Sequence, residues 1–322
     1  MNKEAYYKPS GKISGLYILL FLVFAAIGIP ILSVTYIYAV YYIPIIYISI
    51  FIAVGCGGAL GYIMSLAAKL GKARNPLLVT IFTVFAAVLM KYVQWCFYIP
   101  LVYNDLYEFY EYYFGYALTI GEQLREAVNY FREPAVVWAC IVEVNEYGAW
   151  GITNNGGDVG DAVTGVMLAI VWVIEFLIMA GLALLGCRNW PKRPYSEDTN
   201  TWYRQMDTVY EMDYPANFEN LKNSLESGNI DGFVSNVLEG VSNPNNLLRL
   251  TFFQPSQPSH TEPYYMNISH VFVDDKGKSI TKELASYLAM STINANALFN
   301  AEPVSEAYTP EYNNENTDDS ED

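Results

Sequence analysis

The sequence predicts an α-helical membrane bundle of four transmembrane helices, followed by a cytoplasmic α+β domain and a disordered acidic tail. Three observations indicate this fold class: four long apolar runs, a polar composition that begins only after the last run, and basic clusters at the run ends. A helix needs ~20 apolar residues to cross ~30 Å of hydrocarbon, and each of the four runs reaches that length.

The charge of the chain is divided unequally between its two parts. Residues 1–194 contain 12 acidic and 12 basic residues, whereas residues 195–322 contain 21 acidic and 6 basic ones. The formal net charge of −15 therefore belongs to the C-terminal part. Because an acidic surface repels nucleic-acid phosphates, we expect no nucleic-acid partner; the expected partners are the lipid bilayer and a protein that binds the cytoplasmic domain.

The membrane domain is predicted to cover residues 1–190. Its four spans are expected at residues 13–41, 45–70, 77–99 and 162–186. The first run is too long for the apolar core of a signal peptide, so it should remain in the mature protein. Pro30 predicts a kink inside this span, and the tyrosines that follow it are expected at a membrane interface, namely Tyr36, Tyr38, Tyr41 and Tyr42.

Small residues recur at every fourth position of the second predicted span, at Ala53, Gly57, Gly61 and Ser65. Such a row lets another backbone approach closely along one helix face. We interpret it as a packing seam within the bundle, with a dimer contact as the alternative.

Three polar side chains fall inside the predicted spans: Lys91, Gln94 and Glu175. Lys91 lies ~22 Å and Glu175 ~18 Å above the cytoplasmic ends of their helices, so their depths agree within one turn. An unpaired charge at such depth costs ~3 kcal/mol or more, which a shared ion pair would lower. The alternatives are that Lys91 extends to the headgroups and that Glu175 is protonated.

Residues 100–161 are predicted to be an outer amphipathic segment. Apolar residues recur at helical spacing and face a polar side, at Ile120, Leu124, Val128 and Phe131. Pro134 interrupts this helix, and the apolar stretch 135–144 is too short to cross. Both helices are expected to lie along the outer face or to cap the bundle, before a Gly/Asn-rich loop at 148–157.

A short linker at Pro191 and Pro194 precedes the soluble α+β domain, which is predicted at residues 195–303. Its expected elements are helices at 217–225, 232–238 and 284–298, strands at 247–253 and 264–273, and a turn at 274–277. Residues 304–322 are predicted to be disordered, because eight acidic residues from Glu302 onward meet no basic residue.

Three basic clusters border the predicted spans: Lys3/Lys8/Lys12, Lys69/Lys72/Arg74 and Arg188/Lys192/Arg193. With four spans all three fall on one side, which the positive-inside rule identifies as the cytoplasm. Both termini are therefore expected in the cytoplasm.

Two segments carry a resemblance to known sequences: Tyr6-Tyr7-Lys8-Pro9-Ser10-Gly11-Lys12 and Asn145-Glu146-Tyr147-Gly148-Ala149-Trp150-Gly151. Together with the four spans, they make the membrane half similar to multi-pass bacterial membrane proteins of no assigned activity. The resemblance implies a bacterial inner membrane and implies no site residues or cofactors.

The sequence contains no recognised catalytic or nucleotide-binding motif. Its four cysteines, Cys56, Cys96, Cys140 and Cys187, are expected as buried thiols, with a Cys96–Cys140 disulfide as the alternative. His260 and His270 are expected to be ordinary side chains and not metal ligands. The favoured function is a membrane-anchored scaffold or interaction protein; the alternative is a small transporter or channel that uses Lys91, Gln94 and Glu175, and a membrane enzyme ranks third.

Overall fold

The computed structural model describes residues 5–43, 46–114, 119–148, 151–153, 159–239, 241–256 and 262–300. The chain divides into two compact units. One unit is Pro9–Lys192, and the other combines Met1–Lys8 with Arg193–Asp322. The predicted disordered tail, residues 304–322, lies outside the described residues.

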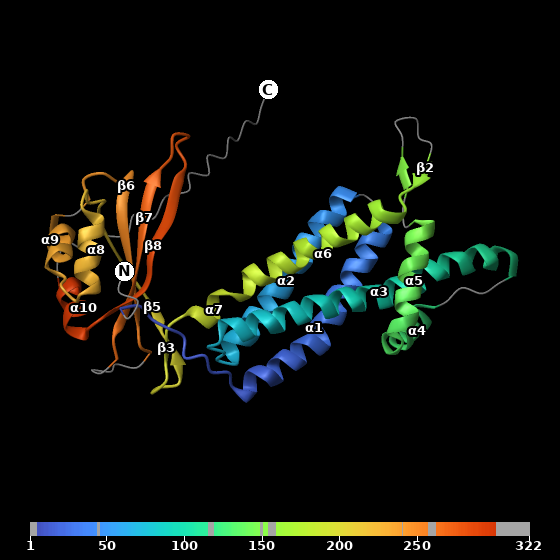
Figure 1. The fold of residues 1–322 in the computed structure, drawn as a ribbon, viewed down its shortest axis with the longest axis horizontal. Helices are drawn as coiled ribbons and strands as arrows, with labels where there is room; N and C mark the ends of the chain where they lie inside the picture. Colours follow the sequence, from blue (N-terminus) through green and yellow to red (C-terminus); the bar gives the residue numbers. More distant parts are fainter. Residues whose placement is uncertain are drawn as a thin grey trace, which may run out of the picture. The chain divides into compact units, whose positions relative to one another are not determined.

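The first unit is built on four long helices that lie side by side (Figure 1). These are α1 (Gly15–Tyr42), α2 (Ile46–Leu70), α3 (Pro76–Phe114) and α6 (Gly165–Cys187). Among the described residues, four helices are long and apolar enough to cross a membrane, and they correspond to the four predicted spans. They cover Gly15–Tyr42, Ile48–Leu70, Pro76–Val102 and Gly165–Lys192. The prediction of four apolar helices is confirmed.

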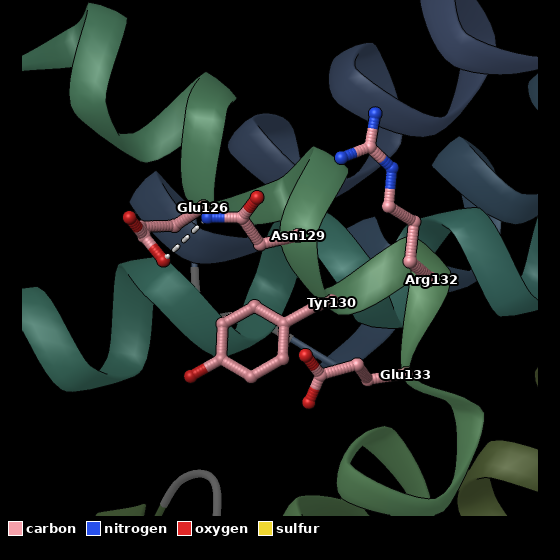
Figure 2. Close-up of a pocket in the computed structure, with 5 residues that line it drawn as sticks. All are labelled: Glu126, Asn129, Tyr130, Arg132 and Glu133. Atoms are coloured by element: carbon pink, nitrogen blue, oxygen red, sulfur yellow. Dashed lines mark hydrogen bonds between the residues drawn. The ribbon is translucent and has the colours of Figure 1, made fainter.

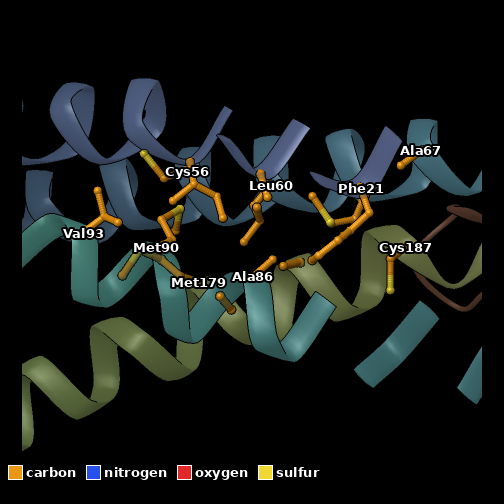
Figure 3. Packing of buried hydrophobic residues seen from close by; sticks show 14 of the residues in the cluster. Phe21, Cys56, Leu60, Ala67, Ala86, Met90, Val93, Met179 and Cys187 are labelled. Atoms are coloured by element: carbon orange, nitrogen blue, oxygen red, sulfur yellow. The ribbon is translucent and has the colours of Figure 1, made fainter. Parts of the chain in front are cut away.

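Apolar side chains occupy both the inside and the outside of this bundle. Leu60, Met90 and Met179 are 1% exposed and pack in its core (Figure 3). Ile27, on the outer face of α1, is 59% exposed. A helix that is apolar on every side is typical of a segment surrounded by lipid or protein, and the outer face here has no protein around it among the described residues.

The third helix is longer than predicted. The sequence places its end at residue 99, but α3 continues through Pro100 to Phe114. Ile99 and Leu101, on either side of Pro100, are 0% and 4% exposed, so burial in the bundle offsets the hydrogen bond that proline removes.

The predicted amphipathic helix is present as α4 (Ile120–Arg132), and α5 (Pro134–Tyr147) follows it. Thr119 and Glu122 form a capping box at the start of α4. The residue of α4 that is buried against the bundle is Ala127, 2% exposed, whereas Leu124, Val128 and Phe131 of the apolar stripe are between 43% and 51% exposed. The stripe is therefore about half-exposed, although the Phe131 ring lies 5.5 Å from the ring of Tyr92 on α3.

The predicted glycine-rich loop contains a small hairpin, β1 (Gly151–Thr153) paired with β2 (Val159–Ala162). Because β2 includes Ala162, α6 begins at Gly165 and not at residue 162 as predicted. The expected linker at Pro191 and Pro194 is also partly ordered, as the short helix α7 (Asn189–Lys192).

The second unit is an α+β fold, as predicted. Its main sheet has the order β5-β6-β7-β8, with each neighbouring pair antiparallel. The strands are β5 (Arg204–Asp213), β6 (Asn246–Gln254), β7 (Tyr264–Val273) and β8 (Ser279–Met290). A second sheet pairs β3 (Tyr195–Ser196) with β4 (Thr201–Trp202).

Three helices cover one face of the main sheet (Figure 1). They are α8 (Phe218–Glu226), α9 (Asp231–Glu239) and α10 (Thr292–Phe299). Met212, Leu248 and Phe252 of the sheet are 0% exposed and pack beneath these helices with Phe233 of α9. The predicted helices at 217–225 and 232–238 and the strands at 247–253 and 264–273 are confirmed within one or two residues.

The predicted final helix at 284–298 is wrong in its first half. Residues 279–290 form β8, which pairs with β7, and only α10 is helical. The stretch Leu284–Met290 contains alanine, leucine and methionine, which favour helix, but Ala285 and Leu288 are buried in the sheet core. Tertiary packing overrides the local preference.

An N-terminal segment, residues 5–7, belongs to the second unit and pairs with the edge of β8 through a single β-bridge, which was not predicted. We call this segment the N-terminal strand. Tyr6 bridges to Leu288 of β8 in antiparallel fashion. The amide of Ala289 donates to the Ala5 carbonyl at 2.7 Å, and the amide of Tyr7 donates to the Tyr287 carbonyl at 2.9 Å. The described N-terminal residues therefore fold with the C-terminal domain and not with the helix bundle.

Candidate functional site

The candidate site is a group of polar side chains inside the helix bundle, centred on an ion pair. Nζ of Lys91 on α3 lies 3.8 Å from Oε2 of Glu175 on α6, and the two side chains are 19% and 12% exposed. The similar helix depths of the two residues had made this pairing one of the alternatives that the sequence left open. Because breaking a buried pair leaves one charge without its partner in an apolar interior, each residue depends on the other.

Tyr36 of α1 joins the pair. Nζ of Lys91 lies 5.7 Å from the centre of the Tyr36 ring, within cation–π range. Tyr36 is 2% exposed, and its buried hydroxyl lies within hydrogen-bond geometry of no described residue. The prediction that Tyr36 marks a membrane interface is therefore wrong.

The position of Tyr36 follows from the buried stripe of α1. The stripe recurs at helical spacing and consists of Tyr17, Phe21, Ala25, Ile29, Ser33, Tyr36 and Ile37. This spacing is visible in the sequence, so it is the signal that would have identified Tyr36. Tyr42 remains at the surface, with 70% exposure, while the Tyr38 hydroxyl donates to Oε1 of Gln123 at 3.1 Å.

Gln94 lies one helical turn from Lys91 and is 1% exposed. Its Nε2 contacts Sδ of Met179 at 3.7 Å, a weak interaction because thioether sulfur is a poor acceptor. Its Oε1 is buried and accepts no hydrogen bond from the described residues. Rotating the amide by 180° would place the nitrogen where Oε1 now lies, so either orientation leaves one strong polar atom without a strong partner among the described residues.

The surroundings of the ion pair are apolar and tightly packed. Met90, Val93 and Met179 lie in the core cluster beside it (Figure 3). Besides the Tyr36 hydroxyl and the Gln94 amide, the Ser33 hydroxyl is a neutral polar group of this region, and it donates to the Met90 carbonyl at 3.2 Å. Such a setting strengthens electrostatic interactions and penalises unpaired polar atoms.

The predicted small-residue seam joins α2 to α6, the helix that carries Glu175. A Cβ atom on Gly57 would lie 2.7 Å from Cα of Met179, and one on Gly61 would lie 3.0 Å from Cα of Ala183. Ala53 is fully buried, and Ser65 is half-buried. Backbone contact of this kind requires residues without side chains, so the seam fixes the position of α6 and with it Glu175.

A second polar feature is a cavity of about 380 Å³ at the junction of α4 and α5. Its lining residues are Glu126, Asn129, Tyr130, Arg132 and Glu133 (Figure 2). The Asn129 amide donates to Oε2 of Glu126 at 3.3 Å. The lining combines two carboxylates with one guanidinium and belongs to the polar side of α4, so we treat it as a surface depression and not as the main site.

The four cysteines behave as predicted. All four cysteines are buried free thiols. Cys96 and Cys140 pack in the same small cluster without a disulfide, so the alternative pairing is absent. His270 shares a 2.6 Å hydrogen bond with Asn246, and burial together with Lys282 lowers its pKa; His260 lies outside the described residues. No group of three metal-ligating side chains occurs among the residues described.

Comparison with known proteins gives no further guide: no protein-family model, curated protein or solved structure matches this chain. The functional argument therefore depends on the residues described above.

Proposed function

We propose that the protein is an integral protein of a bacterial inner membrane that anchors its α+β domain at the cytoplasmic face, where the domain binds a protein partner. The membrane assignment is supported by four helices of sufficient length and hydropathy and by their apolar outer faces. The cytoplasmic assignment is supported by the three basic clusters, which lie on one side of four spans.

The observation that carries the proposal is the pairing of the N-terminal strand with β8. This strand precedes α1 in the chain, and Arg193 of the same unit follows α7, so the second unit is connected to the bundle at two points. A domain that is tied to a bundle through both the first and the last helix is suited to presenting a surface at the membrane.

The bundle supports anchoring more than conduction. Lys91 and Glu175 neutralise one another, and α2 and α6 pack so closely at Gly57 that their backbones touch. A polar route needs several polar groups that face a hydrated space, and transporters commonly provide them in broken helices. The four spanning candidates are continuous helices in the structure.

The face of the main sheet opposite α8, α9 and α10 offers a surface for the partner. One cross-strand row on this face consists of Glu211, Arg249, Ser269 and Glu283, each paired in register with its neighbour. Nε of Arg249 donates to Oε1 of Glu211 at 2.8 Å, which leaves Glu283 as the exposed charge of the row. With a strongly acidic unit around it, this face suits a partner with a basic surface.

Two full-length variants and one truncation test the proposal. Partners would be co-purified from gently solubilised membranes with the wild-type chain, with a chain ending at Lys192, and with single charge reversals. Glu283→Arg on the open face should lose the partner, whereas the matched control Glu219→Arg on exposed α8 should retain it. Retention of every partner by the chain ending at Lys192 would contradict the proposal.

A second candidate function is a small transporter or channel. It is favoured by two buried polar atoms beside the ion pair, the Tyr36 hydroxyl and Oε1 of Gln94, because unsatisfied polar atoms in an apolar interior are costly unless they serve a purpose. Ion or proton flux through proteoliposomes tests it. Flux that Glu175→Gln abolishes would favour transport, and equal leakage in protein-containing and empty vesicles would exclude it.

A further inference from the structure

The N-terminal strand is held by more than backbone hydrogen bonds. The side chains of Tyr6 and Tyr7 contact different parts of the domain, as expected for neighbouring residues of a strand. The Tyr6 hydroxyl donates to Oε1 of Glu226 at 2.8 Å, at the end of α8. The Tyr7 ring lies 5.2 Å from the ring of Tyr265 and 6.5 Å from that of Tyr287, edge-on to both.

The receiving edge of β8 is shaped for such a strand. Tyr287 has a φ of 56°, in the left-handed region that a tyrosine rarely adopts. The Tyr287 amide donates a hydrogen bond to Oδ1 of Asn267 at 2.8 Å, and the Tyr287 carbonyl accepts one from the amide of Tyr7 in the N-terminal strand. Glu226, which accepts the hydrogen bond from the Tyr6 hydroxyl, is 8% exposed. Backbone groups and two side-chain contacts together make this edge a strand-docking site.

The sequence Glu-Ala-Tyr, which includes the docked residues Ala5 and Tyr6, occurs twice in the chain. Glu4-Ala5-Tyr6 precedes the first membrane helix, and Glu306-Ala307-Tyr308 lies in the C-terminal tail. In the N-terminal copy the Ala5 carbonyl accepts a hydrogen bond from the Ala289 amide, and the Tyr6 hydroxyl donates to Glu226. Ala307 and Tyr308 are the matching residues of the tail sequence. A proline follows each motif within three residues, at Pro9 and Pro310, and limits how far a strand can extend.

The tail leaves the domain next to this site. Phe299, the last residue of α10, lies 5.5 Å from the ring of Tyr264, which pairs in register with Met290 of β8. Met290 is the neighbour of Ala289, where the N-terminal strand is bound. The seven Cα-to-Cα steps from Asn300 to Ala307 span up to roughly 24 Å when the chain is extended, which is enough to return to a neighbouring position on the same edge.

We propose that this edge of β8 is a docking site for Glu-Ala-Tyr strands, and that the tail segment Glu306-Ala307-Tyr308 competes for it with the N-terminal strand. The structure shows the N-terminal occupant in place. Charge favours that occupant, because Lys3 and Lys8 flank it, whereas the tail adds acidic residues to an acidic unit. Exchange would release the segment before α1 while the tail holds the edge. This inference does not depend on the proposed function.

Competition between the N-terminal strand and the tail can be measured with a fluorescent peptide of residues 2–10, which is added to protein that keeps both units. The parent variant lacks residues 2–7, so that its docking edge is available to the peptide and to the tail. A tail tethered by a short segment acts at an effective concentration near millimolar, so truncation after Pro303 should tighten peptide binding about tenfold or more. Tyr308→Ala in the parent should reproduce the truncation, and the matched control Tyr312→Ala should bind the peptide like the parent.

Two outcomes would overturn the inference. Equal peptide affinity with and without the tail would remove the tail as an occupant, and absence of peptide binding in every variant would remove the docking site. Should deletion of residues 2–7 prevent folding, full-length Tyr6→Ala replaces it, because this variant keeps the backbone and loses the Glu226 contact. In the Tyr6→Ala background, Tyr308→Ala must tighten peptide binding in the same way as in the parent.

Discussion

The two units of the chain place the same kinds of residue in opposite positions. In the helix bundle, apolar residues such as Ile27 are exposed, while Gln94 and Glu175 are buried. In the α+β unit, Leu248 and Phe252 are fully buried, and charged residues such as Lys276 lie outside. Burial of apolar area stabilises a fold only where water is the alternative, so the comparison teaches that the two units are adapted to different solvents.

The interiors of the two units also differ in how they are packed. The α+β unit fills its core with large rings; the Phe299 ring, for example, lies 5.0 Å from that of Phe252. The bundle brings backbones into contact, with Gly57 and Gly61 of α2 against α6. Within lipid, apolar burial gives little preference for helix association, so close backbone packing and internal polar pairs take over that role.

The largest expected effect is the loss of the internal ion pair. Glu175→Ala and Lys91→Ala should each destabilise the detergent-solubilised protein by about 3–5 kcal/mol, since the remaining charge stays buried without its partner. The double variant should recover part of that loss. A thermal unfolding cycle measures this, with the Arg125–Glu126 pair on α4 as the control, whose side chains are 67% and 37% exposed. Strict additivity of the Lys91 and Glu175 effects would contradict the coupling.

A charge on an exposed apolar position distinguishes the two solvents directly. Ile27→Asp should impair membrane insertion, because an aspartate near the centre of a span costs about 3 kcal/mol. The matched control Ile293→Asp replaces a residue of the α+β unit that is 81% exposed and should insert and fold normally. The amount of protein in the membrane fraction reports the difference. Equal yields of both variants would weaken the comparison.

Packing along the seam predicts opposite signs for two neighbouring glycines. Gly57→Ala should cost about 1–3 kcal/mol, because its Cβ would meet backbone atoms of Met179, which cannot move aside like a side chain. Gly58→Ala meets nothing within 4 Å and should stabilise the helix by about 0.5–1 kcal/mol. Both are read from the melting temperature in one detergent. A loss at both positions, or at neither, would argue against the seam.

The smallest expected effect concerns pH and the α+β unit. Burial and Lys282 lower the pKa of His270 below its ordinary value of 6.5. Well above pH 6.5 the ring is neutral in both the folded and the unfolded chain, so it adds no pH dependence to the free energy of unfolding. As the pH falls below this value, the unfolded chain takes up the proton first and stability decreases. His270→Gln should remove this component from the pH dependence of unfolding, and an unchanged slope would contradict it.

Local features of the membrane half were predictable from sequence because membrane helices are regular. The number of spans follows from apolar length, and the Lys91–Glu175 pairing follows from the rise per residue. The seam follows from the spacing of Gly57 and Gly61. Tyr36 was assigned to an interface together with Tyr38, Tyr41 and Tyr42 because tyrosines near the end of an apolar run resemble interfacial anchors, whereas its position in the buried stripe of α1 turns it inward.

Non-local pairing accounts for the other differences. The strand at residues 5–7 pairs with Leu288, and no local pattern connects two segments so distant in the chain. For the same reason the second half of β8, from Leu284, was predicted to be the start of a helix. Its helix-favouring residues form a strand because they pair with β7. The left-handed Tyr287 and the hydrogen bond to Asn267 are likewise products of that pairing.

The central claim is that a lipid-embedded bundle holds the α+β unit at the cytoplasmic face, and cysteine labelling in intact cells tests it most directly. In a background with the four native cysteines replaced by alanine, single cysteines would be introduced at two exposed positions, Glu146→Cys at the end of α5 and Lys276→Cys in the turn before β8. A membrane-impermeant maleimide should label Glu146→Cys in intact cells and Lys276→Cys only after lysis. Labelling of Lys276→Cys in intact cells, with Glu146→Cys protected until lysis, would contradict the account.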